Sequence, residues 1–153
     1  MLALAAAQLA AQSGDAAKGK ALVESSRCLT CHRIEDKGSR TGPNLSDIGD
    51  RRKVDQIKRA IVTPDDEVLP ENRFVSVTLK DGSTVQGRLR NHDAISVQMI
   101  DSKSQLRSFL TAKLQSLTIL EKGLMPSFKD KLDAAQMTDI VKYLNSLKEA
   151  EKQ

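Results

Sequence analysis

The sequence Cys28-Leu29-Thr30-Cys31-His32 places two cysteines three positions apart, directly before a histidine. Cys-x-x-Cys-His is the pattern by which two thiols attach a haem covalently while the histidine becomes an axial ligand of the iron. Two cysteines at a helical turn can reach both vinyl groups of one porphyrin, and the next residue then lies beneath the metal. The chain contains 2 cysteines in all, and the motif uses both. It therefore predicts one haem c bound through Cys28 and Cys31.

Two other readings of this motif are open on the residues alone. A Cys-x-x-Cys pair can be a redox dithiol, as in thioredoxin-like proteins, or half of a zinc site. Zinc needs two further ligands, and the other histidine, His92, lies in an unrelated part of the chain, between two turn residues, where an exposed loop is expected. A thioredoxin-like fold needs strands alternating with helices around the motif, whereas the surrounding sequence is rich in helical patterns. Haem attachment is therefore the favoured interpretation.

The composition fits one domain, or one domain that carries an insertion. The chain has 153 residues, a formal charge of +4 and only 3% aromatic residues, and a haem would supply a large apolar body to such a core. Residues 1–12 are small and apolar, as in the end of a secretory signal peptide, and are too short to span a membrane. This pattern predicts an exported, periplasmic protein without a transmembrane segment.

A second motif, Gly42-Pro43-Asn44-Leu45, follows the first at a short distance. Together the two motifs resemble the class I c-type cytochromes, which carry a single haem. The resemblance implies that Pro43 lies against the haem and that its carbonyl accepts the proton of the second ring nitrogen of His32. Such a hydrogen bond fixes the orientation and basicity of a histidine ligand. Helices are predicted from Asp15 to about Ser26 and from Val54 to Val62.

The hydrophobic period changes from helical to alternating after residue 65. Five short strands are predicted between Arg73 and Leu120, with a hairpin turn at Asp81-Gly82. The apolar positions of these strands are Val75, Val77 and Leu79; Val85, Gly87 and Leu89; Ile95, Val97 and Met99; Leu106 to Leu110; and Leu117 to Leu120. The pattern predicts a small, strongly bent all-β sheet or barrel that resembles SH3 or Sm-like modules.

The cytochrome pattern resumes at Gly123-Leu124-Met125-Pro126-Ser127-Phe128. This sequence is similar to the loop that delivers the methionine ligand in class I cytochromes, so the resemblance implies Met125 as the second axial ligand. A final helix is expected after it, capped by Asp133 and Gln136. Its expected apolar face consists of Met137, Ile140, Val141, Leu144 and Leu147. In the family this helix crosses the first one where an aromatic residue meets a glycine, and the matching positions are Tyr143 and Gly19.

The distance between the two expected ligands indicates an insertion. His32 and Met125 are 93 positions apart, and leaving out residues 65–120 reduces this separation to 37, which suits a compact haem fold. The prediction is a mainly α cytochrome c fold formed by residues 13–64 and 121–153, with an inserted all-β subdomain at residues 65–120 and an α+β fold overall. This organisation is similar to haem domains associated with quinoprotein-like dehydrogenases in bacteria.

The function implied is electron transfer by an iron-containing haem carrier, not an enzyme. Histidine and methionine ligands together fill both axial positions and raise the reduction potential. The expected partners are redox proteins such as a dehydrogenase, an oxidase or another cytochrome, and the β segment is expected to select among them.

One alternative is a haem-based sensor in which Met125 dissociates from the iron and a small ligand takes its place. Another makes residues 65–120 a binding module. Residues 65–121 have eight acidic and seven basic residues and few aromatics, which argues against nucleic acid.

Overall fold

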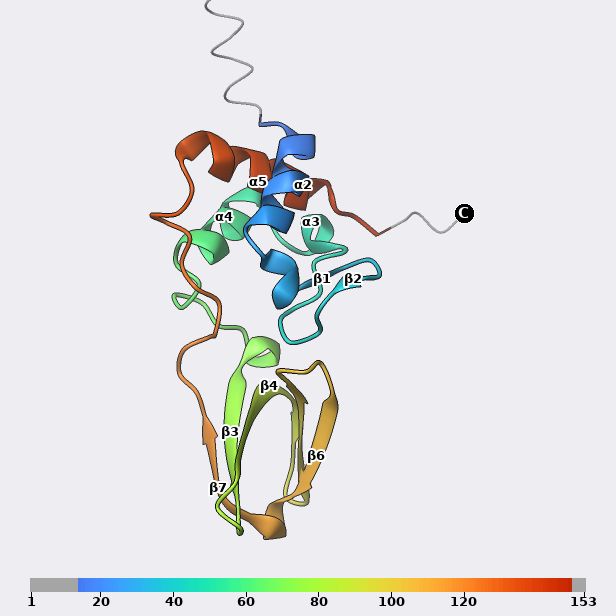
Figure 1. The fold of residues 1–153 in the computed structure, drawn as a ribbon, viewed down its shortest axis with the longest axis vertical. Coiled ribbons are helices and arrows are strands. Elements are labelled where there is room, and N and C mark those ends of the chain that lie inside the picture. Colours follow the sequence, from blue (N-terminus) through green and yellow to red (C-terminus); the bar gives the residue numbers. More distant parts are fainter. Residues whose placement is uncertain (1–13, 150–153) are drawn as a thin grey trace, which may run out of the picture.

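The computed structural model describes residues 14–149 of the chain, which form a helical part and a β sheet at opposite ends of an elongated molecule (Figure 1). The predicted remnant of a signal peptide, residues 1–12, lies outside the described residues. Within residues 14–149 no helix is both long and apolar enough to cross a membrane.

The helical part comes from both ends of the described chain. Its helices are α2 (Ala16–Ser25), η1 (Cys28–Thr30), α3 (Ile48–Arg51), α4 (Val54–Val62) and α5 (Ala134–Ser146), and a small hairpin pairs β1 (Arg33–Ile34) with β2 (Lys37–Gly38). α2 begins at Asp15, whose carboxylate accepts hydrogen bonds from the amides of Ala17 and Lys18. α2, α4 and α5 lie close to their expected positions. The short helix α3 and the β1–β2 hairpin were not expected.

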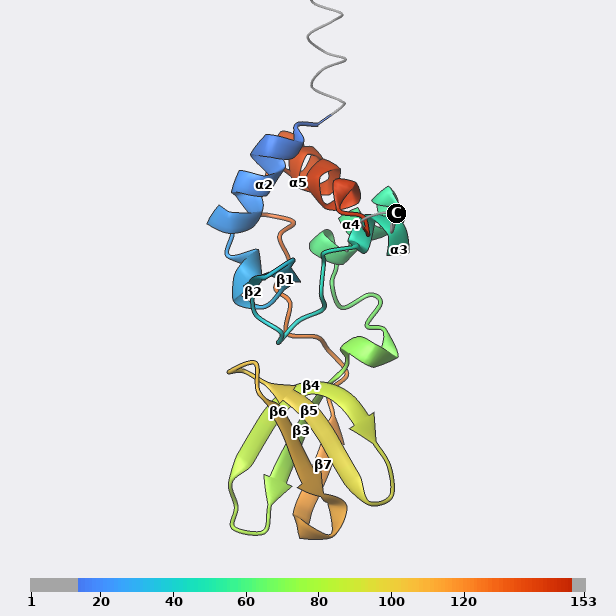
Figure 2. The ribbon, with the colours of Figure 1, turned by 90° about the vertical axis from the view of Figure 1, so that its right-hand side faces the viewer.

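α2 and α5 cross at Gly19, although they are far apart in the sequence (Figure 2). A Cβ atom at Gly19 would lie 2.0 Å from the carbonyl oxygen of Asp139 and 2.8 Å from the Cβ of Tyr143. Only a residue without a side chain allows this approach. The expected meeting of Gly19 with Tyr143 is thus present in the structure.

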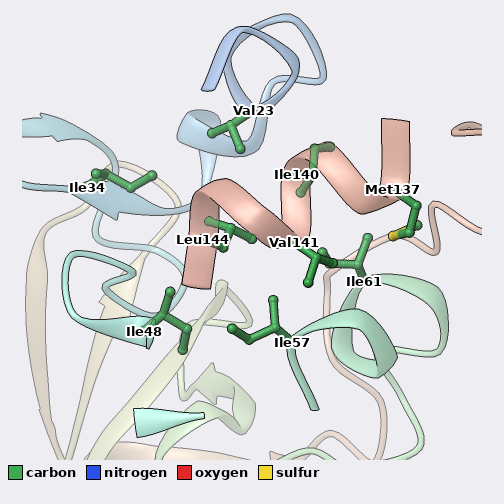
Figure 3. Packing of buried hydrophobic residues seen from close by; sticks show 9 residues of the cluster. All are labelled: Val23, Ile34, Ile48, Ile57, Ile61, Met137, Ile140, Val141 and Leu144. Atoms are coloured by element: carbon green, nitrogen blue, oxygen red, sulfur yellow. The ribbon is translucent and has the colours of Figure 1, made fainter. Parts of the chain in front are cut away.

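The helices enclose one hydrophobic core. Figure 3 shows that its side chains converge from α2, β1, α3, α4 and α5: Val23, Ile34, Ile48, Ile57, Ile61, Met137, Ile140, Val141 and Leu144. Burial of these side chains is the main favourable term that holds the helices together. The expected apolar face of α5 supplies four of the nine residues.

A capping box opens α5 and gives a first testable prediction. The carboxylate of Asp133 accepts a hydrogen bond from the amide of Gln136, and the side chain of Gln136 accepts one from the amide of Asp133. We expect Asp133→Ala to lower the free energy of unfolding by about 1 kcal/mol, because one helix donor loses its partner. Denaturant titration measures this change. Asp130, which is exposed and makes no hydrogen bond or ion pair within residues 14–149, is the control, and an equal loss for Asp130→Ala would contradict the prediction.

The β sheet has five antiparallel strands in the order β6-β5-β4-β3-β7. Their bounds are β3 (Phe74–Leu79), β4 (Thr84–His92), β5 (Ser96–Asp101), β6 (Leu106–Leu110) and β7 (Leu114–Ile119), preceded by the turn η2 (Pro70–Asn72) and with η3 (Thr111–Lys113) between the last two strands. Successive strands from β3 to β6 pair with one another, and β7 returns to pair with β3. The sheet has its own core of Val75, Val77, Val97 and Met99.

Three details of the sheet differ from the prediction. Ile95 was expected to face the core but is 72% exposed, because it lies in the turn before β5. The last strand begins at Leu114, not Leu117. His92 was expected in a loop, whereas it is the exposed last residue of β4 and pairs with Val97. Hydrophobic alternation identifies a strand well, but it does not show where the turn ends.

Candidate functional site

The Cys28–His32 motif follows α2 after a sharp change of backbone direction. Arg27 adopts a left-handed conformation with φ 58°, and the turn η1 begins directly after it. The carbonyl of Cys28 then accepts hydrogen bonds from the amides of Cys31 (3.2 Å) and His32 (2.9 Å). This single turn brings the two thiols and the imidazole to the same end of the helical part. Both cysteines are free thiols; Cys28 is half-buried against the helical core and Cys31 is exposed.

His32 is held through one of its two ring nitrogens. Its Nδ1 lies 2.9 Å from the carbonyl oxygen of Pro43, so the ring donates a proton there and Nε2 remains available to a metal. Burial lowers the pKa of His32, the Pro43 carbonyl opposes this shift, and the charge of Arg88 lowers the pKa further. A lowered pKa keeps the imidazole neutral at neutral pH, which is the form that binds metal. The hydrogen bond is the one expected from the sequence.

Two glycines allow the chain to wrap closely around His32. Gly38 has φ 100°, and a Cβ there would lie 2.2 Å from the carbonyl oxygen of His32. A Cβ at Gly42 would lie 3.1 Å from both Cε1 and Nδ1 of the imidazole, and the Gly42 amide donates to the carbonyl of Cys31. Gly42 belongs to a motif noted in the sequence. Gly38 was missed, because only the β1–β2 hairpin reveals its role.

Met125 reaches the same hydrophobic core from the other end of the chain. It is half-buried and packs against the helical cluster, as Cys28 does. Its loop is fixed on both sides by long-range hydrogen bonds. The amide of Gly123 donates to Asp65 (3.0 Å), and the amide of Phe128 donates to the carbonyl of Ile61 at the end of α4 (3.0 Å). In Figure 1 the orange segment after β7 runs up one side of the molecule from the sheet to α5.

The other histidine and the other methionines of the described residues lie on strands or a helix, and none lies in a loop as Met125 does. His92 is in the sheet and exposed. Met99 is fully buried in the sheet core, and Met137 is buried in the helical core on α5. Within residues 14–149 no group of three or more histidine, cysteine, aspartate or glutamate side chains is arranged to hold a metal ion.

The residues brought together suit a haem c. Two unpaired thiols stand beside an imidazole with one free nitrogen, and a thioether packs against the same apolar cluster. Thiols form the covalent links of such a group, while imidazole and thioether are known axial ligands of its iron. The partly buried Leu29, Leu45 and Phe128, which also pack on the cluster, add apolar surface suited to a porphyrin. The donor set and its surroundings therefore fit this cofactor.

Arg88 is a further residue of the site that the sequence analysis missed. It extends from β4, is only 8% exposed, and donates hydrogen bonds to the carbonyls of Arg40 and Thr41, three and two residues before Pro43. Its strand pattern places it on the face opposite the sheet core, where a charged residue is ordinarily exposed. No signal in the sequence shows that this face meets the loop beside His32.

Comparison with known proteins finds one similarity, in the first part of the chain. No curated protein matches it in a sequence search. The family model for cytochrome c matches residues 16–75, a range that contains the two cysteines, His32 and Pro43 and ends before Met125. With the geometry above, this match supports a c-type cytochrome, a haem-based electron carrier rather than an enzyme.

Proposed function

We propose that this protein transfers single electrons through one haem c, held by thioether links to Cys28 and Cys31 and by axial ligation from His32 and Met125. The observation that carries the proposal is the hydrogen bond from His32 Nδ1 to the Pro43 carbonyl, made by a histidine that directly follows two free thiols. A dithiol enzyme has no need of a neutral, oriented imidazole with its second nitrogen free. An axial ligand needs both properties.

Each residue has a distinct role in this proposal. The haem iron, when bound, supplies one-electron chemistry by alternating between its ferric and ferrous states. His32 provides Nε2, and Pro43 fixes the ring and raises its basicity. The anchored loop of Met125 offers a thioether from the opposite end of the chain, and this side chain packs against the apolar helical core. With both axial positions filled, no site remains for substrate, and transfer occurs to a partner protein at the surface.

We extend the proposal to the organisation of the chain. Residues 13–64 and 121–153 form a class I haem domain, and residues 65–120 are an SH3/Sm-like insertion, related to domains associated with quinoprotein-like dehydrogenases. Two observations support this division. α2 packs directly on α5, although all the strands of the sheet lie between them in the sequence, and the helices and the sheet have separate cores. We propose export to the periplasm and redox proteins as partners, with the sheet selecting among them.

The experiment that tests the function is a visible absorption spectrum of the purified protein, oxidised and then reduced with dithionite. Protein produced with the haem-attachment machinery is expected to show sharp α and β bands on reduction. These bands should persist after denaturation and acid–acetone extraction, because the links are covalent. Absence of haem bands would contradict the proposal and favour the interpretation of the two cysteines as a redox dithiol. Binding of carbon monoxide to the native ferrous protein would indicate that Met125 is displaceable and favour a sensor.

A further inference from the structure

We propose that Arg88 of the β sheet is a positioning residue for His32 that also raises the reduction potential of the haem site. The inference rests on the function proposed above, since it needs a haem iron bound to His32. It gives the sheet a role inside the redox centre. Selection of partners would be a separate role of the same sheet.

Arg88 ties the sheet to the loop that supports the histidine. Its Nε donates to the carbonyl of Thr41 and its Nη2 to that of Arg40, each at 3.0 Å, and Nη1 approaches the carbonyl of Glu71 at 3.5 Å. The planar guanidinium fork can hold two neighbouring carbonyls in one orientation, which an ammonium group does less well. Because Pro43 follows this pair of carbonyls, the fork fixes the approach of the Pro43 carbonyl to His32.

A second contact from the sheet holds the same loop. The hydroxyl of Ser104, in the turn between β5 and β6, lies 2.7 Å from that of Ser39 and accepts a hydrogen bond from the amide of Arg40 (3.0 Å). Asp101 shapes this turn by accepting bonds from the amides of Lys103 and Gln105. Figure 2 shows that the bent middle of β4 and the turn after β5 form the side of the sheet that faces the β1–β2 region. The loop before Pro43 is therefore clamped by two parts of the sheet.

The charge of Arg88 is not neutralised by a carboxylate. Within residues 14–149 its hydrogen bonds go to backbone carbonyls, and no ion pair includes it, whereas the nearby Asp101 pairs with Arg107 at 3.4 Å. Burial lowers the pKa of Arg88, yet an arginine stays protonated in proteins. Its cross-strand neighbours are Phe74 and Ile100, both apolar. A buried, uncompensated cation interacts strongly with other charges because little water screens it.

The sign of the effect follows from the electron count. The oxidised site carries one more positive charge than the reduced site, so a nearby fixed cation disfavours the oxidised form. The site with Arg88 therefore holds its electron more firmly, which means a higher potential. Arg88 acts close to the ligand, because its hydrogen bonds end on the loop whose Pro43 carbonyl lies 2.9 Å from His32 Nδ1.

The test compares R88M and R88K with R90M in the haem-loaded protein. Arg90 lies two positions further along β4 and is exposed, and its side chain makes no hydrogen bond or ion pair within residues 14–149, so R90M removes the same charge from a solvated position. The first measurement is the reduced spectrum, which checks the proposed function independently. The second is the midpoint potential. The third is the exchange rate of the His32 Nδ1 proton with solvent, followed by NMR in the ferrous state.

We expect R88M to shift the redox equilibrium about tenfold toward the oxidised form, equivalent to about 59 mV for one electron, and R90M by less than twofold. R88K keeps the charge but loses the fork, so its potential should stay close to that of the parent while its Nδ1 proton exchanges faster. The proposal is overturned if R88M and R90M give equal potentials, or if Nδ1 exchange in R88K is unchanged. Should R88M fail to accumulate with haem, R88K alone decides the positioning role. Parent protein without haem would instead refute the proposed function.

Discussion

Replacing Gly19 with alanine is expected to destabilise the protein by about 3 kcal/mol or more, although alanine is the better helix former. Propensity alone favours alanine by about 1 kcal/mol in a helix interior. The added Cβ, however, would lie 2.0 Å from the backbone oxygen of Asp139 in α5. That oxygen cannot turn away as the end of a flexible side chain can, so α2 and α5 must separate, and overpacking of this kind costs about 1–3 kcal/mol or more.

Thermal unfolding of the haem-loaded protein measures this effect. For a chain of this size, 3 kcal/mol corresponds to a drop in Tm of roughly 6–12 °C. Gly123→Ala is a matched control, because the same methyl group there would have no neighbour closer than 3.7 Å. We expect that control to stay within about 0.5 kcal/mol of the parent. A Gly19→Ala protein with an unchanged or higher Tm would contradict the close crossing of the two helices.

The second large effect is expected from Met125→His, which should lower the reduction potential by on the order of 100 mV or more, since axial ligands tune haem potentials over about 0.8 V. Thioether ligation favours the reduced iron, whereas a second imidazole favours the oxidised iron. The weak long-wavelength band that a sulfur ligand gives the oxidised protein should disappear. Spectroelectrochemical titration follows the potential and the band in one experiment.

Met137→Leu is the control for this substitution. Met137 belongs to the helical core against which Met125 packs, but it is only 6% exposed and lies on α5 rather than in a loop. A Met to Leu exchange nearly conserves volume and costs less than about 1.5 kcal/mol. Loss of the sulfur band in Met137→Leu, with retention in Met125→His, would move the ligand from the loop to the helix.

Sequence patterns predicted the three longer helices, α2, α4 and α5, because their signals are local. Asp15 and Asp133 are polar caps placed directly before apolar periods, and each caps a helix in the structure. The His32–Pro43 hydrogen bond was expected from the resemblance of two short motifs, and it is present at 2.9 Å. Motifs of this kind are informative because the residues that act together also lie close in the chain.

The parts that were missed depend on contacts between distant segments. The sequence pattern places Arg88 on the outer face of a strand, where a charged residue is expected in solvent. It is buried because that face packs against residues 40 and 41. The β1–β2 hairpin has only two residues in each strand, too few to produce an alternation. Ile95 continues the alternation of β5, yet the carboxylate of Asp93 accepts hydrogen bonds from the amides of Ile95 and Ser96. That turn leaves the isoleucine in solvent.

The hydrogen bond between Asp65 and Gly123 has a consequence for folding kinetics. It connects the residue just before the sheet segment to a residue just after it, at 3.0 Å. Once the sheet has formed, the two ends of this segment are therefore close together, and His32 and Met125 are separated by a shorter flexible chain. Closing an unstructured segment of 93 residues instead of 37 costs about 0.8 kcal/mol more in chain entropy. β3 to β6 pair with their neighbours in sequence, which favours their early formation. Lengthening the turn at Gly82, where an added side chain meets nothing within 4 Å, should therefore leave the rate at which the methionine loop docks unchanged.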